Sequence, residues 1–111
     1  MLVKIERVKN YIVARLPREA KTPDAQLRSN IFELIEAKDI KAILIDMAEI
    51  AEITDALAAL VVAIQNAAGR KNLRVIYFNL AGMAKDYFVS SGLAAVLEIY
   101  GTELQALRMV L

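Results

Sequence analysis

The sequence predicts an α/β fold in which a mixed sheet of four or five strands carries about four helices, mainly on one face. Two neighbouring segments lead to this prediction. The run Ala42–Met47 is aliphatic and suits a strand that is covered on both faces. Nine consecutive apolar residues, Ala56–Ile64, follow directly behind Thr54-Asp55 and favour a helix. A strand, a short acidic loop and a helix in this order are typical of parallel strands joined by right-handed crossovers.

The chain opens with a predicted β-hairpin. Leu2, Ile5 and Val8 are apolar among charged neighbours, which predicts a strand with one solvated face. Lys9-Asn10 favours a turn, because Asn tolerates positive φ, and a second strand follows over 11–16. The later elements are predicted as a helix from 23 to about 37, a strand at 42–47, a helix at about 55–68, a strand at 73–79, a helix at 83–91, a brief strand at 96–100 and a helix from 103 to about 110. The predicted order is ββαβαβα(β)α in one domain, residues 1–111.

Residues with capping chemistry mark where the helices begin and end. A short side-chain oxygen accepts from the free N–H groups of a first turn, and a glycine adopts the left-handed conformation that closes a last turn. The predicted N-caps are Thr22 with Pro23 in the first helical position, Thr54 or Asp55, and Thr102, and the predicted glycine stops are Gly69 and Gly92. Thr102 and Gln105 form a predicted capping box.

Composition restricts the classes of function. The 111 residues include no histidine and no cysteine, which removes the usual general base, the commonest metal ligand and every Ser-His or Cys-His pair. We therefore expect a non-enzyme with no cofactor and no metal centre. The net charge of +1 lacks the basic face that nucleic-acid binding requires. No apolar run approaches the roughly 20 residues of a membrane span, and residues 1–6 do not resemble a signal peptide, so we expect a cytoplasmic protein.

Four carboxylates lie close together in the sequence behind the buried strand. They are Asp46, Glu49, Glu52 and Asp55. One interpretation is a Mg²⁺ site, because that ion prefers oxygen ligands. The interpretation that we favour is a solvated loop that ends in a helix cap.

The apolar helix predicted at 55–68 carries two stripes at helical spacing. The first consists of Leu57, Leu60, Val61 and Ile64, and the second of Ala56, Ala59, Val62 and Ala63. One stripe covers the sheet. The other is either buried beneath the domain's own loops or is a docking surface, where small side chains allow a partner to approach closely. We favour docking, because the neighbouring elements are too short to cover both faces.

The segment Leu44-Ile45-Asp46, the helix behind it and the strand Leu73–Leu80 resemble the STAS domain. This is the fold of bacterial anti-sigma factor antagonists and of cytoplasmic domains on sulphate transporters. Val89-Ser90-Ser91-Gly92-Leu93 is similar to the loop after the third helix of that family. The resemblance covers most of the chain through length, element order and apolar spacing.

The sequence departs from the family where the long helix begins. In STAS antagonists a serine at this place accepts phosphate from a partner kinase. An ungapped count from Asp46 places Ala56 at the acceptor position, and one inserted residue places Leu57 there. Neither register supplies a hydroxyl, and the family's Gly-Leu-Gly is missing. Thr54 is the only hydroxyl nearby.

The resemblance implies a non-catalytic protein-interaction module of the anti-sigma factor antagonist type, without the usual serine switch. Its expected partner is an anti-sigma factor or a kinase-like regulatory protein, docked through the loop-helix region 49–63. The alternatives are a STAS subunit of a membrane transporter complex and a homo-oligomeric signalling scaffold, such as a homodimer. The predicted partner-binding residues are Glu52, Thr54, Asp55, Ala56, Ala59, Val62 and Ala63. The hydroxyls considered for modification are those of Thr54, Ser90 and Ser91.

Overall fold

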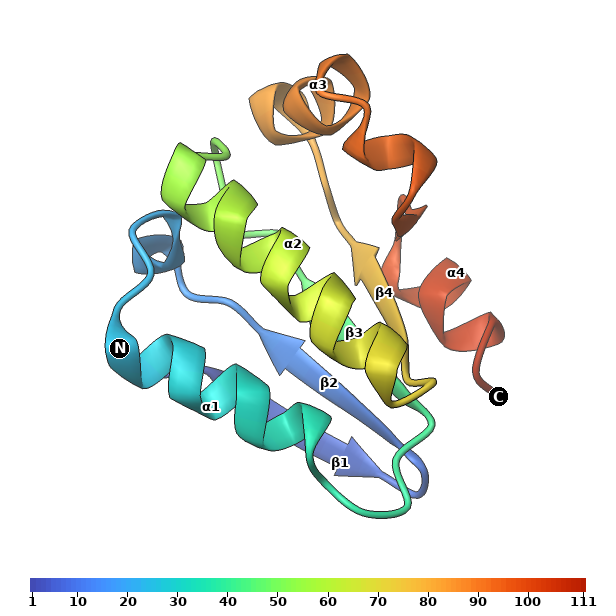
Figure 1. The fold of residues 1–111 in the computed structure, drawn as a ribbon. Helices are drawn as coiled ribbons and strands as arrows, with labels where there is room; N and C mark the ends of the chain where they lie inside the picture. Colours follow the sequence, from blue (N-terminus) through green and yellow to red (C-terminus); the bar gives the residue numbers. More distant parts are fainter.

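The structure, a computed structural model, describes all residues from Met1 to Leu111 and contains one five-stranded mixed sheet (Figure 1). The strands are β1 (Lys4–Val8), β2 (Tyr11–Arg15), β3 (Ala42–Asp46), β4 (Arg74–Phe78) and β5 (Glu98–Tyr100), and their spatial order is β1-β2-β3-β4-β5. β1 is antiparallel to β2, and all other neighbouring strands are parallel. The helices are α1 (Ala25–Ile35), α2 (Asp55–Arg70), α3 (Gly82–Ser90) and α4 (Glu103–Arg108), with short 3₁₀ turns η1 (Arg18–Lys21) and η2 (Leu93–Ala95). The predicted fold class and element order are confirmed.

Helices cover the two faces of the sheet unequally. α1 and α2 lie side by side across one face in Figure 1, and the larger apolar core lies between them and the sheet. A smaller cluster on the opposite face packs under α4, which contacts β4 and β5. Every residue of β3 is buried, which confirms a strand covered on both sides. No helix combines the length and the apolar character that a membrane crossing requires.

The alternation of side chains along β3 determines which residues face which helix. Ile43 and Ile45 belong to the larger core beneath α1 and α2, whereas Ala42 and Leu44 belong to the cluster beneath α4. Asp46 has the same parity as Leu44, so it faces the α4 side of the sheet. The carboxylate at the end of the central strand is therefore directed toward α4 and not toward α2.

Two predicted helix boundaries were wrong. Asp24 is the N-cap of α1, and its carboxylate accepts from the N–H of Leu27 at 2.8 Å. Thr22 instead ends η1, where its hydroxyl donates to a carbonyl, and Pro23 lies outside the helix. Gly69 lies inside α2, which continues to Arg70. The positive φ that follows belongs to Asn72, at 54°.

The hairpin also differs in detail from the prediction. All five residues of β1 are exposed, because β1 is an edge strand that is paired only with β2. In the turn, the positive φ of 52° belongs to Lys9 and not to Asn10. Elsewhere the predicted glycine stop is confirmed at Gly92, where φ is 83°, and so is the capping box of Thr102 with Gln105.

Candidate partner-binding site

Three apolar residues anchor the loop between β3 and α2. Met47, Ile50 and Ile53 are all buried in the larger core. The positions between them are exposed, including Glu49 and Glu52. The loop is thus fixed from beneath while its acidic side chains face solvent.

Thr54 is the N-cap of α2 and ties the loop to a second segment. Its hydroxyl oxygen accepts from the N–H of Leu57 at 3.1 Å. The same hydroxyl donates to the backbone carbonyl of Lys21, at the end of η1. Both hydrogen-bonding functions of Thr54 are therefore used inside the fold. Of the two predicted caps, Thr54 is the one that caps, and Asp55 lies exposed in the first turn.

The two stripes of α2 have opposite environments. The first stripe is fully buried, as predicted, and consists of Leu57, Leu60, Val61 and Ile64. The second, which we call the outer face of α2, consists of Ala56, Ala59, Val62 and Ala63. Ala56 and Ala59 are exposed, Val62 retains 42% of its surface, and Ala63 is half-buried. The domain's own loops do not cover this face.

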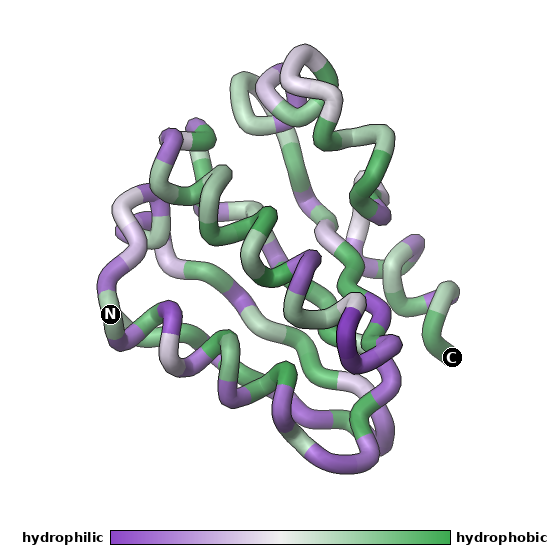
Figure 2. Tube along the Cα trace, in the orientation of Figure 1, coloured by the Kyte–Doolittle hydropathy of each residue, from purple (hydrophilic) through white to green (hydrophobic).

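The hydropathy along the chain agrees with this division. Figure 2 shows hydrophobic residues along α2 from its start to beyond its middle, and hydrophilic residues near its end. This apolar stretch faces solvent at Ala59 and Val62, on the side away from the sheet. An apolar helix face that the monomer leaves uncovered is typical of an interaction surface.

The two candidate serines lie at the end of α3. Ser90 and Ser91 are exposed. Their hydroxyls donate to carbonyls one turn earlier, those of Tyr87 at 3.3 Å and Phe88 at 3.4 Å. These long bonds are the local contacts that hydroxyl side chains make at a helix end.

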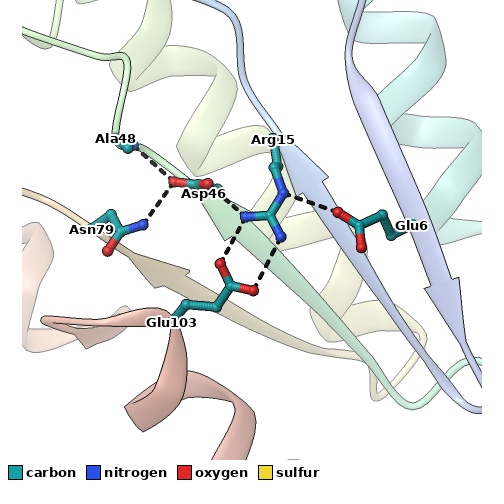
Figure 3. Close-up of polar contacts among 6 residues, drawn as sticks. All are labelled: Glu6, Arg15, Asp46, Ala48, Asn79 and Glu103. Carbon is teal, nitrogen blue, oxygen red and sulfur yellow. Dashed lines mark hydrogen bonds and ion pairs between the residues drawn. The ribbon is translucent and has the colours of Figure 1, made fainter.

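A network of polar side chains lies at the carboxyl ends of the parallel strands (Figure 3). The Arg15 network, as we call it, consists of Glu6, Arg15, Asp46, Asn79 and Glu103. Arg15 ends β2, Asp46 ends β3, and Asn79 follows β4. Because parallel neighbours end at the same edge of a sheet, the three side chains meet there.

Asp46 uses both carboxylate oxygens in this network. Oδ1 accepts from the Ala48 N–H at 2.9 Å and from Asn79 Nδ2 at 3.1 Å. Oδ2 accepts from Arg15 Nη1 at 2.8 Å. The Asp46 carboxylate thus orients the start of the β3–α2 loop and pairs its buried charge with Arg15.

Glu103 brings α4 into the same network. Its carboxylate accepts two hydrogen bonds from Arg15, at 2.8 Å and 3.0 Å. These bonds lower the pKa of Glu103, since they favour the ionised form, and bonds to Glu103 and Asp46 raise the pKa of Arg15. Arg15 Nε also donates to Glu6 at 3.1 Å.

Sequence reasoning identified Asp46 as the point where the strand leaves the core, but not its partners. Arg15, Asn79 and Glu103 come from three distant segments, and no local pattern joins them. The expected ends of the parallel strands could have suggested Arg15 and Asn79.

The structure also separates the four carboxylates considered for Mg²⁺. Asp46 is directed toward Arg15, whereas Glu49, Glu52 and Asp55 are exposed around the loop. No three acidic side chains lie close enough together to hold a metal ion.

Comparisons with known proteins define the fold. No protein-family model matches the sequence, and no curated protein matches it. Solved structures do match over nearly the whole chain. A STAS domain protein from Planctomyces limnophilus has a TM-score of 0.83 at 13% identity, covering 96% of this chain and 96% of that chain. RsbS from Moorella thermoacetica has a TM-score of 0.83 at 15% identity, covering 96% of this chain and 92% of that chain.

The phosphorylated form of the Bacillus cell fate determinant SpoIIAA has a TM-score of 0.72 at 20% identity. The match covers 99% of this chain and 100% of that chain. The protein therefore has the fold of STAS domains and anti-sigma factor antagonists, at sequence identities that indicate fold alone.

Proposed function

We propose that this protein is a non-catalytic interaction module that docks onto a regulatory protein through the loop-helix region 49–63. The observation that carries the proposal is the outer face of α2, which is apolar, small in its side chains and uncovered in the monomer. It lies on a helix whose other face is fixed in the core. Such a rigid surface loses little side-chain entropy on binding.

The chemistry of the region indicates the kind of partner. Ala56, Ala59 and Val62 form a shallow apolar face, and the exposed carboxylates of Glu52 and Asp55 border it at the start of the helix. A partner with an apolar contact surface and basic residues at its rim is complementary to this arrangement. The similarity to SpoIIAA and RsbS supports an anti-sigma factor or a kinase-like regulator as that partner, acting in the cytoplasm.

The proposal includes the loss of the serine switch. Ala56 and Leu57, the two residues that fall at the acceptor position, have no hydroxyl. Thr54 has one, but it donates to the Lys21 carbonyl and accepts from the Leu57 N–H. A phosphate on Thr54 would break the first of these bonds. Binding would then be constitutive, with the negative charge of Asp55 fixed at the helix N-terminus, where a carboxylate is favoured.

The test places a charge on the outer face of α2. Ala59→Arg and Val62→Arg should each weaken binding to the candidate anti-sigma factor or kinase-like protein by roughly tenfold or more, because a guanidinium would be buried in an apolar contact. Binding is measured by calorimetry with purified proteins.

Ser29→Arg is the matched control, since it adds the same charge to an exposed position of α1. Circular dichroism establishes that each variant is folded. Unchanged affinity in folded Ala59→Arg and Val62→Arg would contradict the proposal, and so would a loss of folding in both, because the face would then belong to the core.

A further inference from the structure

β1 is an edge strand with large apolar side chains on its surface. Leu2 is 81% exposed, Ile5 44% and Val8 40%. An edge strand also presents unpaired N–H and C=O groups that can pair with another strand. The amino-terminal strand therefore combines an open backbone edge with apolar residues on both sides of the sheet.

The register of the hairpin indicates which backbone groups are open. Val8 pairs with Tyr11 across a two-residue loop. Residues that flank such a loop exchange main-chain hydrogen bonds, and this alternates along the ladder. Val8, Glu6 and Lys4 are thus directed toward β2. The outward N–H and C=O groups belong to the alternate residues, Val3, Ile5 and Arg7.

We propose that a second copy of this chain pairs with β1 in antiparallel register, centred on Ile5. In this register Ile5 lies opposite Ile5 of the second copy, and Leu2 lies opposite Val8. Lys4 lies opposite Glu6, so two pairs of opposite charge form across the two-fold axis. The pairing joins the two sheets into one continuous sheet, with about six new main-chain hydrogen bonds.

Charge complementarity selects this register among its neighbours. A pairing centred on Glu6 places two carboxylates opposite each other and sets Lys4 against Val8. A pairing centred on Lys4 places two ammonium groups opposite each other and sets Leu2 against Glu6. Like charges directly opposite are destabilising. Only the register centred on Ile5 pairs all three exposed apolar residues with each other and Lys4 with Glu6.

The interface goes beyond the proposed function and uses a different part of the molecule. β1 is the outermost strand beside β2, whereas α2 packs over β4. Figure 1 shows α1 between β1 and α2. A dimer formed through β1 leaves the outer face of α2 free in both copies, so it would offer two docking surfaces.

Site-specific cross-linking tests the register, because the chain has no cysteine of its own. In the proposed dimer the two Ile5 Cα atoms are about 5.5 Å apart, within the range of a disulfide. Ile5→Cys should therefore oxidise rapidly to a covalent dimer. Val8→Cys is the matched control on the same strand, since its two copies would lie about 20 Å apart.

Mixing Leu2→Cys with Val8→Cys gives a second positive arm. These two proteins should form a mixed disulfide faster than either forms a disulfide alone. Equal cross-linking rates for Ile5→Cys and Val8→Cys would overturn the register.

Charge exchange tests the interface without cysteines. Lys4→Glu turns both cross-strand pairs repulsive and should weaken self-association by roughly tenfold, measured by sedimentation equilibrium. The double variant Lys4→Glu with Glu6→Lys restores opposite charges and should recover most of the loss.

Lys4 lies opposite Arg15 within the chain, so a glutamate there does not place like charges together in the monomer. Binding of the regulatory partner through α2 should be unchanged in Lys4→Glu, which separates this proposal from the proposed function. A wild-type chain that remains monomeric at high concentration would overturn the proposal and would indicate an edge kept open by its own charges.

Discussion

At the scale of single residues, Thr54 joins three segments through one hydroxyl. It caps α2, it belongs to the loop after β3, and it contacts the end of η1 through the Lys21 carbonyl. The hydroxyl acts as donor and acceptor at once, which a backbone cap alone does not require. Thr54 therefore fixes the position of the loop that carries Glu52, as well as the start of the helix.

This role predicts how Thr54 responds to substitution. Thr54→Ala removes both hydrogen bonds and should lower the free energy of unfolding by about 0.5–2 kcal/mol. Thr54→Ser keeps the hydroxyl and should change it by less than about 0.5 kcal/mol. Urea unfolding of the three proteins measures the difference. An equal loss in both variants would indicate that the methyl group, and not the hydroxyl, is what matters at this position.

Capping also illustrates where local reasoning fails. Thr22 and Asp24 both have side chains that cap helices, and Pro23 is compatible with a start at either one. Asp24 caps, with φ of −100° and ψ of 177°, and its carboxylate accepts from Leu27. The choice depends on η1, which uses Thr22 to end its own turn. The sequence pattern does not contain that competing contact.

At the scale of elements, β3 and α2 were predictable because their environments are uniform along their length. β3 is buried on both sides, so its aliphatic run is unbroken, and the buried stripe of α2 repeats at helical spacing. β1 was harder to predict because its alternation suggests one buried face. As an edge strand it has none, since no element covers it fully.

The two faces of α2 should respond differently to the loss of side-chain volume. Leu60 is 1% exposed, and Leu60→Ala should lower the free energy of unfolding by about 2–5 kcal/mol, because it leaves a cavity in the core. Val62→Ala, two residues away, should change it by no more than about 0.5 kcal/mol. Both values come from urea unfolding with a common slope. A large loss for Val62→Ala would mean that its side chain contributes to the folded core, and it would weaken the assignment of the outer face as a docking surface.

At the scale of the whole molecule, the Arg15 network connects the two layers of the fold. Glu6 comes from β1, Arg15 from β2, Asp46 from β3 and Glu103 from α4. Figure 3 shows the guanidinium of Arg15 between the three carboxylates. Its planar fork matches Glu103 through two parallel bonds, which a lysine could not form. The only helix on the second face is therefore held by charge as well as by apolar contact.

Little of this network was predictable, because its members are separated by up to 88 positions in the chain, as Arg15 and Glu103 are. Long-range ion pairs have no periodicity for a sequence to display. The topology alone determines that the strand ends meet.

The network also makes stability depend on pH in a calculable direction. Hydrogen bonds from Arg15 lower the pKa of Glu103 in the folded protein. A carboxyl group whose pKa is lower in the folded state stabilises the fold above its unfolded pKa, about 4.3 for Glu. That contribution is lost as the pH falls from there through the folded pKa. Asp24 titrates in the same direction, because the Leu27 N–H and the chain's amino terminus lower its pKa.

Glu103→Gln isolates the contribution of Glu103. At pH 7 the variant should be less stable than the wild type, because an amide cannot replace the charged pair with Arg15. As the pH falls below about 4.3, the wild type should lose stability more steeply than the variant, so that the two curves approach each other. Urea unfolding at a series of pH values measures the gap. Glu33→Gln removes an exposed carboxylate from α1 and should run parallel to the wild type throughout. A gap between Glu103→Gln and the wild type that stays constant down to pH 2 would mean that the ionised pair with Arg15 does not stabilise the folded protein.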